Sequence, residues 1–174
     1  MSENLYAPPE ADLEAGSDGQ AGYYVVSTRK FFLLSVLTLN LYLVYWFYRN
    51  WRQVKAQTGM DLWAPMRGLF YIFFTHSLFA RIADTLAERG RDFRWSHGAN
   101  ATVVVILTLL INILDRLAWR GLISPTADAL ATVLIVALPL TVLKAQRAIN
   151  VAEGDPDGSA NNRYTIANWA WSIV

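Results

Sequence analysis

Few side chains in this sequence stand where they could do chemistry. His76 is the only ionisable residue in the middle of an apolar segment, which makes it a candidate for a proton relay or a ligand site. Its nearest helical partner, Asp84, would lie about 12 Å away along the axis, and His97 is expected in a loop. No HxxxH or HxxE spacing is present, so we predict no metal site and no cofactor. We interpret His76 as a hydrogen-bonded interhelical or interfacial residue, with the relay as the alternative.

A second set of polar residues forms a stripe on an otherwise apolar helix. Thr108, Asn112 and Asp115 recur at i, i+4 and i+7, and the next apolar segment begins with polar residues that can face them. These are Asp128 and Thr132, with Arg116 and Arg120 at the same end. The stripe is typical of interhelical hydrogen bonds worth about 1 kcal/mol each. The alternative is a polar permeation path.

No catalytic constellation accompanies these residues. The sequence has no cysteine, which excludes disulfides, thiolate metal sites and cysteine nucleophiles. It also lacks the GxSxG, P-loop and GxGxxG patterns. Ser77 and Ser96 each precede or follow a histidine directly, and sequence neighbours on a helix do not face each other. We therefore expect a protein that is not an enzyme.

The composition predicts an integral membrane protein. Of 174 residues, 54% are hydrophobic and 17% charged, with seven Trp, eight Tyr and eight Phe. Residues 1–22 carry five acids and no base, whereas the remainder carries all 15 Lys and Arg. The basic residues flank apolar segments, which suits a bilayer with anionic headgroups and not a nucleic acid. A protein partner or a homo-oligomer stays open.

The first apolar segment lies between basic residues at 29–57. Its uncharged stretch, Phe31–Tyr48, would be about 27 Å long as a straight helix, just short of a bilayer core. Asn40 tolerates left-handed backbone and marks a break point for a dip into one leaflet. We predict membrane-interface anchors at its aromatic and basic residues and at three further tryptophans: Tyr42, Tyr45, Trp46, Arg49, Trp51, Arg52, Trp119, Trp169 and Trp171.

The fold class predicted for the whole chain is all-α. A second helical segment, 65–88, has an apolar centre of only 13 residues and is either interfacial, re-entrant or a short span. Segments at about 100–119 and 125–146 form a transmembrane helical hairpin. Residues 23–150 make up the helical membrane domain, followed by a polar loop at 151–163. Ser27 or Thr28 is expected to cap the first helix and Asn100 the third.

The two ends of the chain are expected to differ in character. Residues 1–22 are acidic and rich in Pro, Gly and Ala, which predicts a disordered cytoplasmic tail with no cleavable signal peptide. Residues 164–174 are apolar with two Trp, which predicts an interfacial helix or a truncated span.

Charge distribution favours one of two topologies. Four spans with an internal N-terminus place nine Lys and Arg inside and six outside. Two spans, with the first two segments re-entrant or interfacial, place 13 inside and two outside. The second arrangement obeys the positive-inside rule better, and both put the two termini in the cytoplasm.

Two stretches resemble known bacterial sequences. The opening Asn4-Leu5-Tyr6-Ala7-Pro8-Pro9 resembles the NPYAPP-type start of small inner-membrane proteins of Gram-negative bacteria. Thr38–Trp51, TLNLYLVYWFYRNW, resembles a bacterial membrane family of unknown function whose motif reads T-x-G-x-Y-x-x-Y-W-x-Y, with Asn40 in place of the glycine. The resemblance implies a bacterial inner-membrane location and no activity. We expect a small non-catalytic interaction or membrane-organising component, or alternatively a transporter or channel component.

Overall fold

A computed structural model describes residues 22–122 and 124–164, without the side chains of residues 125, 127 and 128. The described chain consists of helices and loops and contains no strand. Six α-helices and one short 3-10 helix follow each other: α1 (Thr28–Leu37), α2 (Leu41–Thr58), α3 (Ala64–Leu69), α4 (Tyr71–Glu88), α5 (His97–Trp119), α6 (Pro125–Ala152) and the 3-10 helix at Ser159–Asn161.

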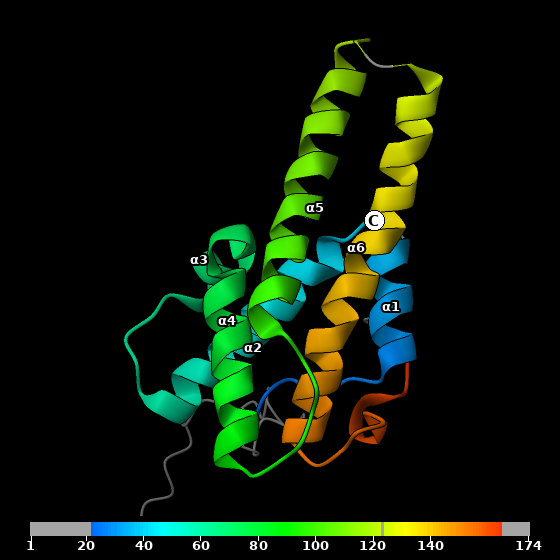
Figure 1. The fold of residues 1–174 in the computed structure, drawn as a ribbon. Coiled ribbons are helices and arrows are strands. Elements are labelled where there is room, and N and C mark those ends of the chain that lie inside the picture. Colours follow the sequence, from blue (N-terminus) through cyan, green and yellow to red (C-terminus); the bar gives the residue numbers. More distant parts are fainter. Residues whose placement is uncertain (1–21, 123, 165–174) are drawn as a thin grey trace, which may run out of the picture.

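Helices α5 and α6 lie side by side and project well beyond the other helices (Figure 1). They are joined by a short turn at Gly121, where φ is +66°. Two stretches, His97–Trp119 and Ala129–Ala152, are long and apolar enough to cross a membrane. Both predicted helices of the 100–119 and 125–146 pair are present, and α6 runs six residues further than expected. We call the turn at 120–124 the tip, and the loops 22–27, 89–96 and 153–163 at the opposite end the base.

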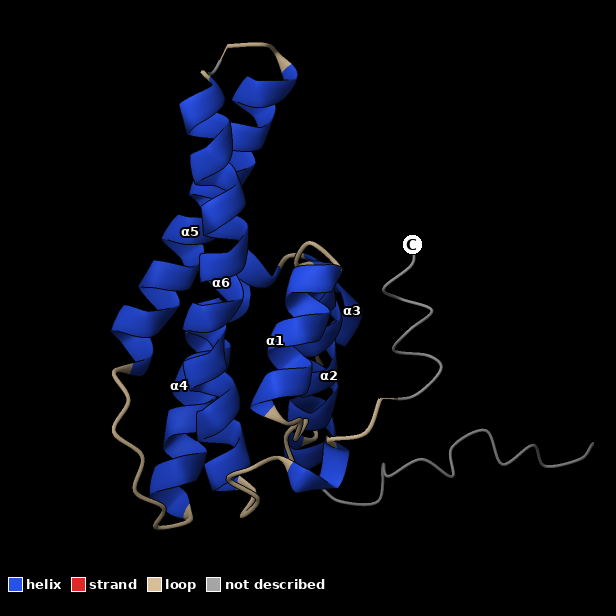
Figure 2. Ribbon diagram, turned by 90° about the vertical axis from the view of Figure 1, so that its right-hand side faces the viewer, coloured by secondary structure: helices blue, strands red, loops and turns tan. Residues whose placement is uncertain are grey.

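The break predicted at Asn40 is confirmed. Leu39 and Asn40 both adopt left-handed backbone, with φ of +48° and +70°, and separate α1 from α2. The predicted cap of α1 is also present, since the Ser27 hydroxyl accepts a hydrogen bond from the Lys30 backbone N–H. The 29–57 segment is therefore two helices that meet at a turn part of the way along α6 (Figure 2).

The prediction of a single helix over 65–88 is wrong, because the segment breaks at Phe70. The short α3 crosses α2 so closely that Gly68 lies against Tyr48, whereas α4 packs beside α5 and α6. The break lets the Tyr71 ring stack on Phe47 at 4.7 Å. Neither Gly nor Pro occupies position 70, so the sequence carries no local signal for the break.

The expected cap at Asn100 is also wrong. Helix α5 begins at His97, and Asn100 lies in its first turn with its side chain buried against α6. Asn100 Nδ2 donates to the Thr141 carbonyl at 3.0 Å, and its Oδ1 accepts from Trp95 Nε1 at 3.0 Å. The residue therefore joins two helices and does not begin one.

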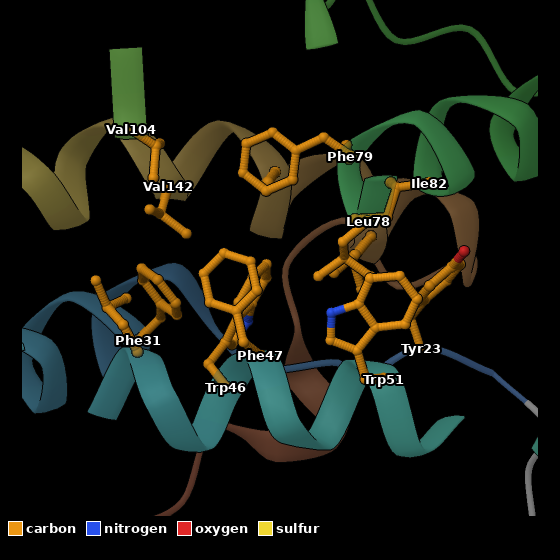
Figure 3. Packing of buried hydrophobic residues seen from close by; sticks show 14 of the residues in the cluster. Tyr23, Phe31, Trp46, Phe47, Trp51, Leu78, Phe79, Ile82, Val104 and Val142 are labelled. Atoms are coloured by element: carbon orange, nitrogen blue, oxygen red, sulfur yellow. The ribbon is translucent and has the colours of Figure 1, made fainter. Parts of the chain in front are cut away.

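The aromatic residues of α2 build the core. Trp46, Phe47 and Trp51 point from α2 toward α4 and α6, and each is completely buried (Figure 3). Phe47 lies edge-on to Trp46 at 4.9 Å, and the Arg67 guanidinium covers the Trp51 ring at 4.3 Å. Burial of rings of this size is a large hydrophobic contribution to folding.

Three predicted interface anchors are therefore wrong. Tyr42, Trp46 and Trp51 are 9%, 0% and 0% exposed, because they lie on the face of α2 that packs against the other helices. Tyr45 and Trp119 are exposed, whereas Arg49 lies over the Tyr24 ring and Arg52 is half-buried. The anchors predicted at Trp169 and Trp171 lie outside the described residues.

An extended segment, Tyr23–Val26, passes through this core without a strand to pair with. Buried amide side chains satisfy its backbone. Asn50 Oδ1 accepts from the Tyr24 N–H at 3.1 Å, Gln146 Nε2 donates to the Tyr24 carbonyl at 3.3 Å, and Asn150 Nδ2 donates to the Val26 carbonyl at 3.0 Å. All three amides are 0% exposed, and Trp46 Nε1 donates to Gln146 Oε1.

The predicted polar loop at 151–163 packs back onto α1. Lys30 is buried, and its Nζ donates to Asn161 Oδ1 at 2.7 Å and to the Arg163 carbonyl at 2.6 Å. Burial lowers the pKa of this lysine. Within the loop, backbone N–H groups of Ala160 and Ser159 hold the pKa of Asp155 below its usual range. The loop is therefore an ordered part of the base. Residues 1–21 and 165–174, predicted as a tail and an interfacial helix, lie outside the described chain.

The close crossing of α2 and α3 predicts the effect of Gly68→Ala. An added Cβ would lie 2.7 Å from Tyr48 Cβ and 2.9 Å from its backbone, so the helices must separate. We expect a loss of about 1–3 kcal/mol in the free energy of unfolding, measured by thermal unfolding in detergent. Gly98→Ala is the matched control in α5, since its Cβ meets nothing within 4 Å. Equal stability of the two variants would contradict the close crossing.

Candidate functional site

A partly open groove of about 490 Å³ lies where the α1–α2 turn meets α5 and α6. The turn supplies one wall through Leu39, Asn40, Leu41 and Val44, and Tyr71 at the start of α4 closes one side. The remaining lining comes from α5 and α6: Thr108, Ile111, Asn112, Asp115, Ala118, Ala131, Thr132, Ile135 and Leu138. The predicted polar stripe of α5 thus forms one wall of a groove.

The Asn40 side chain joins the α1–α2 turn to α6. Its Nδ2 donates to the Ile135 carbonyl in α6 at 2.9 Å. That carbonyl lacks its normal helical donor, because residue 139 is a proline without a backbone N–H. The Asn40 side chain therefore replaces the missing hydrogen bond and fixes the turn against α6. Its Oδ1 is buried and has no hydrogen-bond partner in the described chain.

The three stripe residues on α5 differ in how they are bonded. Thr108 is buried, and its hydroxyl donates to the Val104 carbonyl at 2.8 Å and lies 3.3 Å from the Tyr71 hydroxyl. Asn112 Nδ2 donates to the Thr108 carbonyl at 2.7 Å, which leaves its Oδ1 as the unused group. Asp115 is exposed and makes no hydrogen bond or ion pair with the described residues.

The balance of free polar groups in the groove follows from these bonds. The amide nitrogens of Asn40 and Asn112 each donate one N–H to a backbone carbonyl and keep a second N–H. Asn112 Oδ1 and the Asp115 carboxylate are acceptors without a hydrogen-bond partner in the described chain. Asp115 is also the only charged residue in the described lining. The groove therefore carries one negative charge beside an unpaired amide oxygen, in a lining that is otherwise largely apolar.

His76 lies elsewhere. Its Nε2 is 3.1 Å from the Thr102 hydroxyl of α5, and the side chain is exposed. This is the interhelical hydrogen bond expected for the residue, and His76 is not part of the groove. No group of three His, Cys, Asp or Glu side chains that could hold a metal ion occurs in the described part of the chain.

Two groove residues were not predicted as site residues. Tyr71 lies in the apolar centre of the predicted 65–88 segment, and the Phe70 break places its hydroxyl beside Thr108. Asn40 was read as a break point, and its amide bond to α6 is a tertiary feature. Pro139 was the available signal, because the carbonyl it frees at Ile135 needs a donor from another segment. The side chain of Asp128, predicted to face the stripe, lies outside the described residues.

The Asn40 bridge can be tested with a double-mutant cycle. Asn40→Gly keeps left-handed backbone accessible and removes only the side-chain bond, so we expect a loss of about 1 kcal/mol in unfolding free energy. In a Pro139→Ala background, residue 139 can donate to Ile135 itself, and the loss should shrink. Asn40→Ala should cost about 1–2 kcal/mol more than Asn40→Gly, because alanine is strained at this φ. Equal losses for Asn40→Gly in both backgrounds would contradict the bridge.

Comparison with known proteins adds no residues to this site. No protein-family model, curated protein or solved structure matches the chain. The resemblance of Thr38–Trp51 to a bacterial membrane family stays a prediction, and the site is defined by its geometry.

Proposed function

We propose that the protein is a two-span integral membrane protein that acts as a small non-catalytic interaction or membrane-organising component. The observation that carries the membrane assignment is the apolar surface of α5 and α6. Only 17% and 28% of the residues in their most apolar windows are buried, whereas the core helix of a soluble protein is mostly buried. Large apolar side chains are exposed on both helices, among them Ile106, Leu109, Ile113, Leu130, Val133 and Leu140. A surface of this size needs an apolar environment.

The arrangement of the other helices supports two spans. The α1–α2 turn meets α6 at Ile135, ten residues or about 15 Å from the start of α6 at Pro125. Leu39 and Leu41 at this turn are 72% and 67% exposed. An apolar turn that ends part of the way along the long helices fits a segment that enters one leaflet and returns.

The charges support an orientation with the base in the cytoplasm. Exposed basic side chains lie outside the tip, in α1, α2, the loop before α5 and the part of α6 far from the tip, among them Arg29, Lys55, Arg91, Arg94, Lys144 and Arg147. Arg116 and Arg120 lie near the tip. In this orientation the base meets the anionic headgroups of the inner leaflet, and only two basic residues face outward. The resemblance noted above favours the inner membrane of a bacterium.

A transporter or channel component is the second candidate. The observation in its favour is the polar groove, whose lining on α5 runs from Thr108 in the middle of the helix through Asn112 to Asp115 near the tip. Flux of a small solute into proteoliposomes that is lost in Asn112→Leu, at unchanged incorporation, would establish it. Flux that is absent or insensitive to this substitution would favour the non-catalytic component.

Cysteine labelling tests the topology, because the sequence has no native cysteine. In spheroplasts, a membrane-impermeant thiol reagent should label Ser124→Cys at the tip and should not label Ala56→Cys or Asp92→Cys before lysis. All three positions are exposed. Ser124 is external and Asp92 internal in both topologies, so these two are controls. Labelling of Ala56→Cys in intact spheroplasts would establish four spans and contradict the re-entrant arrangement.

A further inference from the structure

We propose that the groove binds an amphipathic primary ammonium group, with the charged nitrogen at Asn112 and Asp115 and an apolar body toward the α1–α2 turn. The inference goes beyond the role proposed above, since it concerns a ligand of a specific chemical class. It depends on the groove alone, so it stands or fails separately from the topology.

The unpaired acceptors on α5 select a ligand that donates hydrogen bonds. Asn112 Nδ2 donates one of its two N–H groups to the Thr108 carbonyl, whereas Asn112 Oδ1 and the Asp115 carboxylate have no hydrogen-bond partner in the described chain. Asn40 Oδ1 is buried and is not offered to the groove. A primary ammonium carries three N–H donors and no acceptor, as lysine does, and is the complement of an amide oxygen beside a carboxylate.

The charge and spacing of the α5 wall place the nitrogen. Asn112 and Asp115 are three residues apart, so their side chains are neighbours on one helix face and can accept from one nitrogen. Asp115 supplies the only charge of the described lining and has no cationic partner in the described chain. An anionic ligand would meet this carboxylate without a compensating base in the lining.

The size and the apolar part of the groove argue against a bare metal ion. A volume of about 490 Å³ is in the range of sites for small organic molecules. Leu39, Leu41 and Val44 offer an apolar surface that a hydrated or naked cation would not use. An alkyl chain attached to the ammonium would cover it. Such an amine can be a free molecule or the headgroup end of an aminolipid.

Binding can be measured on the full chain in nanodiscs of zwitterionic phosphatidylcholine. The probes are octylammonium and octanol, which share the alkyl chain and differ in the head, and empty nanodiscs supply the partitioning background. We expect saturable binding of octylammonium and at least about tenfold weaker binding of octanol, because octanol makes no charge-assisted hydrogen bond. Equal affinity for both probes would overturn the proposal.

Two substitutions test the assigned residues. Asp115→Asn should weaken octylammonium binding at least about tenfold and leave octanol unchanged, and Asn112→Leu should weaken it less. Both side chains are exposed, so folding is expected to persist, and the thermal unfolding midpoint checks this. Asp157→Asn, an exposed carboxylate in the base, is the matched control and should bind as the wild type does. Octylammonium affinity that is independent of Asp115 would refute the site.

The source of the amine is decided by a second measurement. Mass spectrometry of the protein extracted in mild detergent compares the aminolipid retained by the wild type and by Asp115→Asn. Lower retention in the variant identifies an aminolipid as the occupant. Equal retention, together with Asp115-dependent octylammonium binding, identifies a free amine. Equal retention without such binding overturns the proposal.

Discussion

The hydrogen bonds between three buried amides and one extended segment hold the base together. Tyr23–Val26 runs between α2 and α6 with no strand beside it, so its backbone polar groups depend on Asn50, Gln146 and Asn150. An unsatisfied buried backbone group costs about 1–3 kcal/mol, more than a made bond contributes. Removing one of these amides would therefore cost mainly the free energy of leaving a backbone group buried without a hydrogen bond. The same network ties α2 to α6, because Trp46 donates to Gln146.

The groove lies where the packed core of α1, α2, α4 and α6 ends. Below the α1–α2 turn, α6 is covered by α1 and α4, and its residues Val142, Ala145 and Ile149 are buried. Toward the tip, α5 and α6 project together beyond the other helices (Figure 1). The Asn40 bond at Ile135 marks this boundary, and the polar residues of the groove lie on the open side of it. The packed core and the exposed apolar part of the α5–α6 pair therefore meet at one level of the molecule.

The sequence predicted the helices better than their packing. Apolar length and flanking charge were enough to place the α5–α6 pair, and backbone preference was enough to place the Asn40 break. Trp46 and Trp51 were assigned to the interface because aromatic enrichment is shared by bilayer interfaces and protein cores. Asn50 lies at i+4 from Trp46, and Asn150 at i+4 from Gln146, so the buried amides follow the core face of each helix. Polar residues at that spacing were the overlooked signal.

Only one wall of the groove could be predicted from the sequence, because the other wall depends on tertiary packing. The i, i+4, i+7 spacing of Thr108, Asn112 and Asp115 gave one wall, because a helix alone determines which side chains share a face. The opposite wall comes from a turn 68 residues earlier, and its position depends on one hydrogen bond to a carbonyl freed by Pro139. A proline within a helix leaves one backbone carbonyl without its hydrogen-bond donor, and a second segment that supplies a donor must lie close to it. In an apolar chain, a proline in one helix and an asparagine at a break between two others therefore indicate that these two segments are in contact.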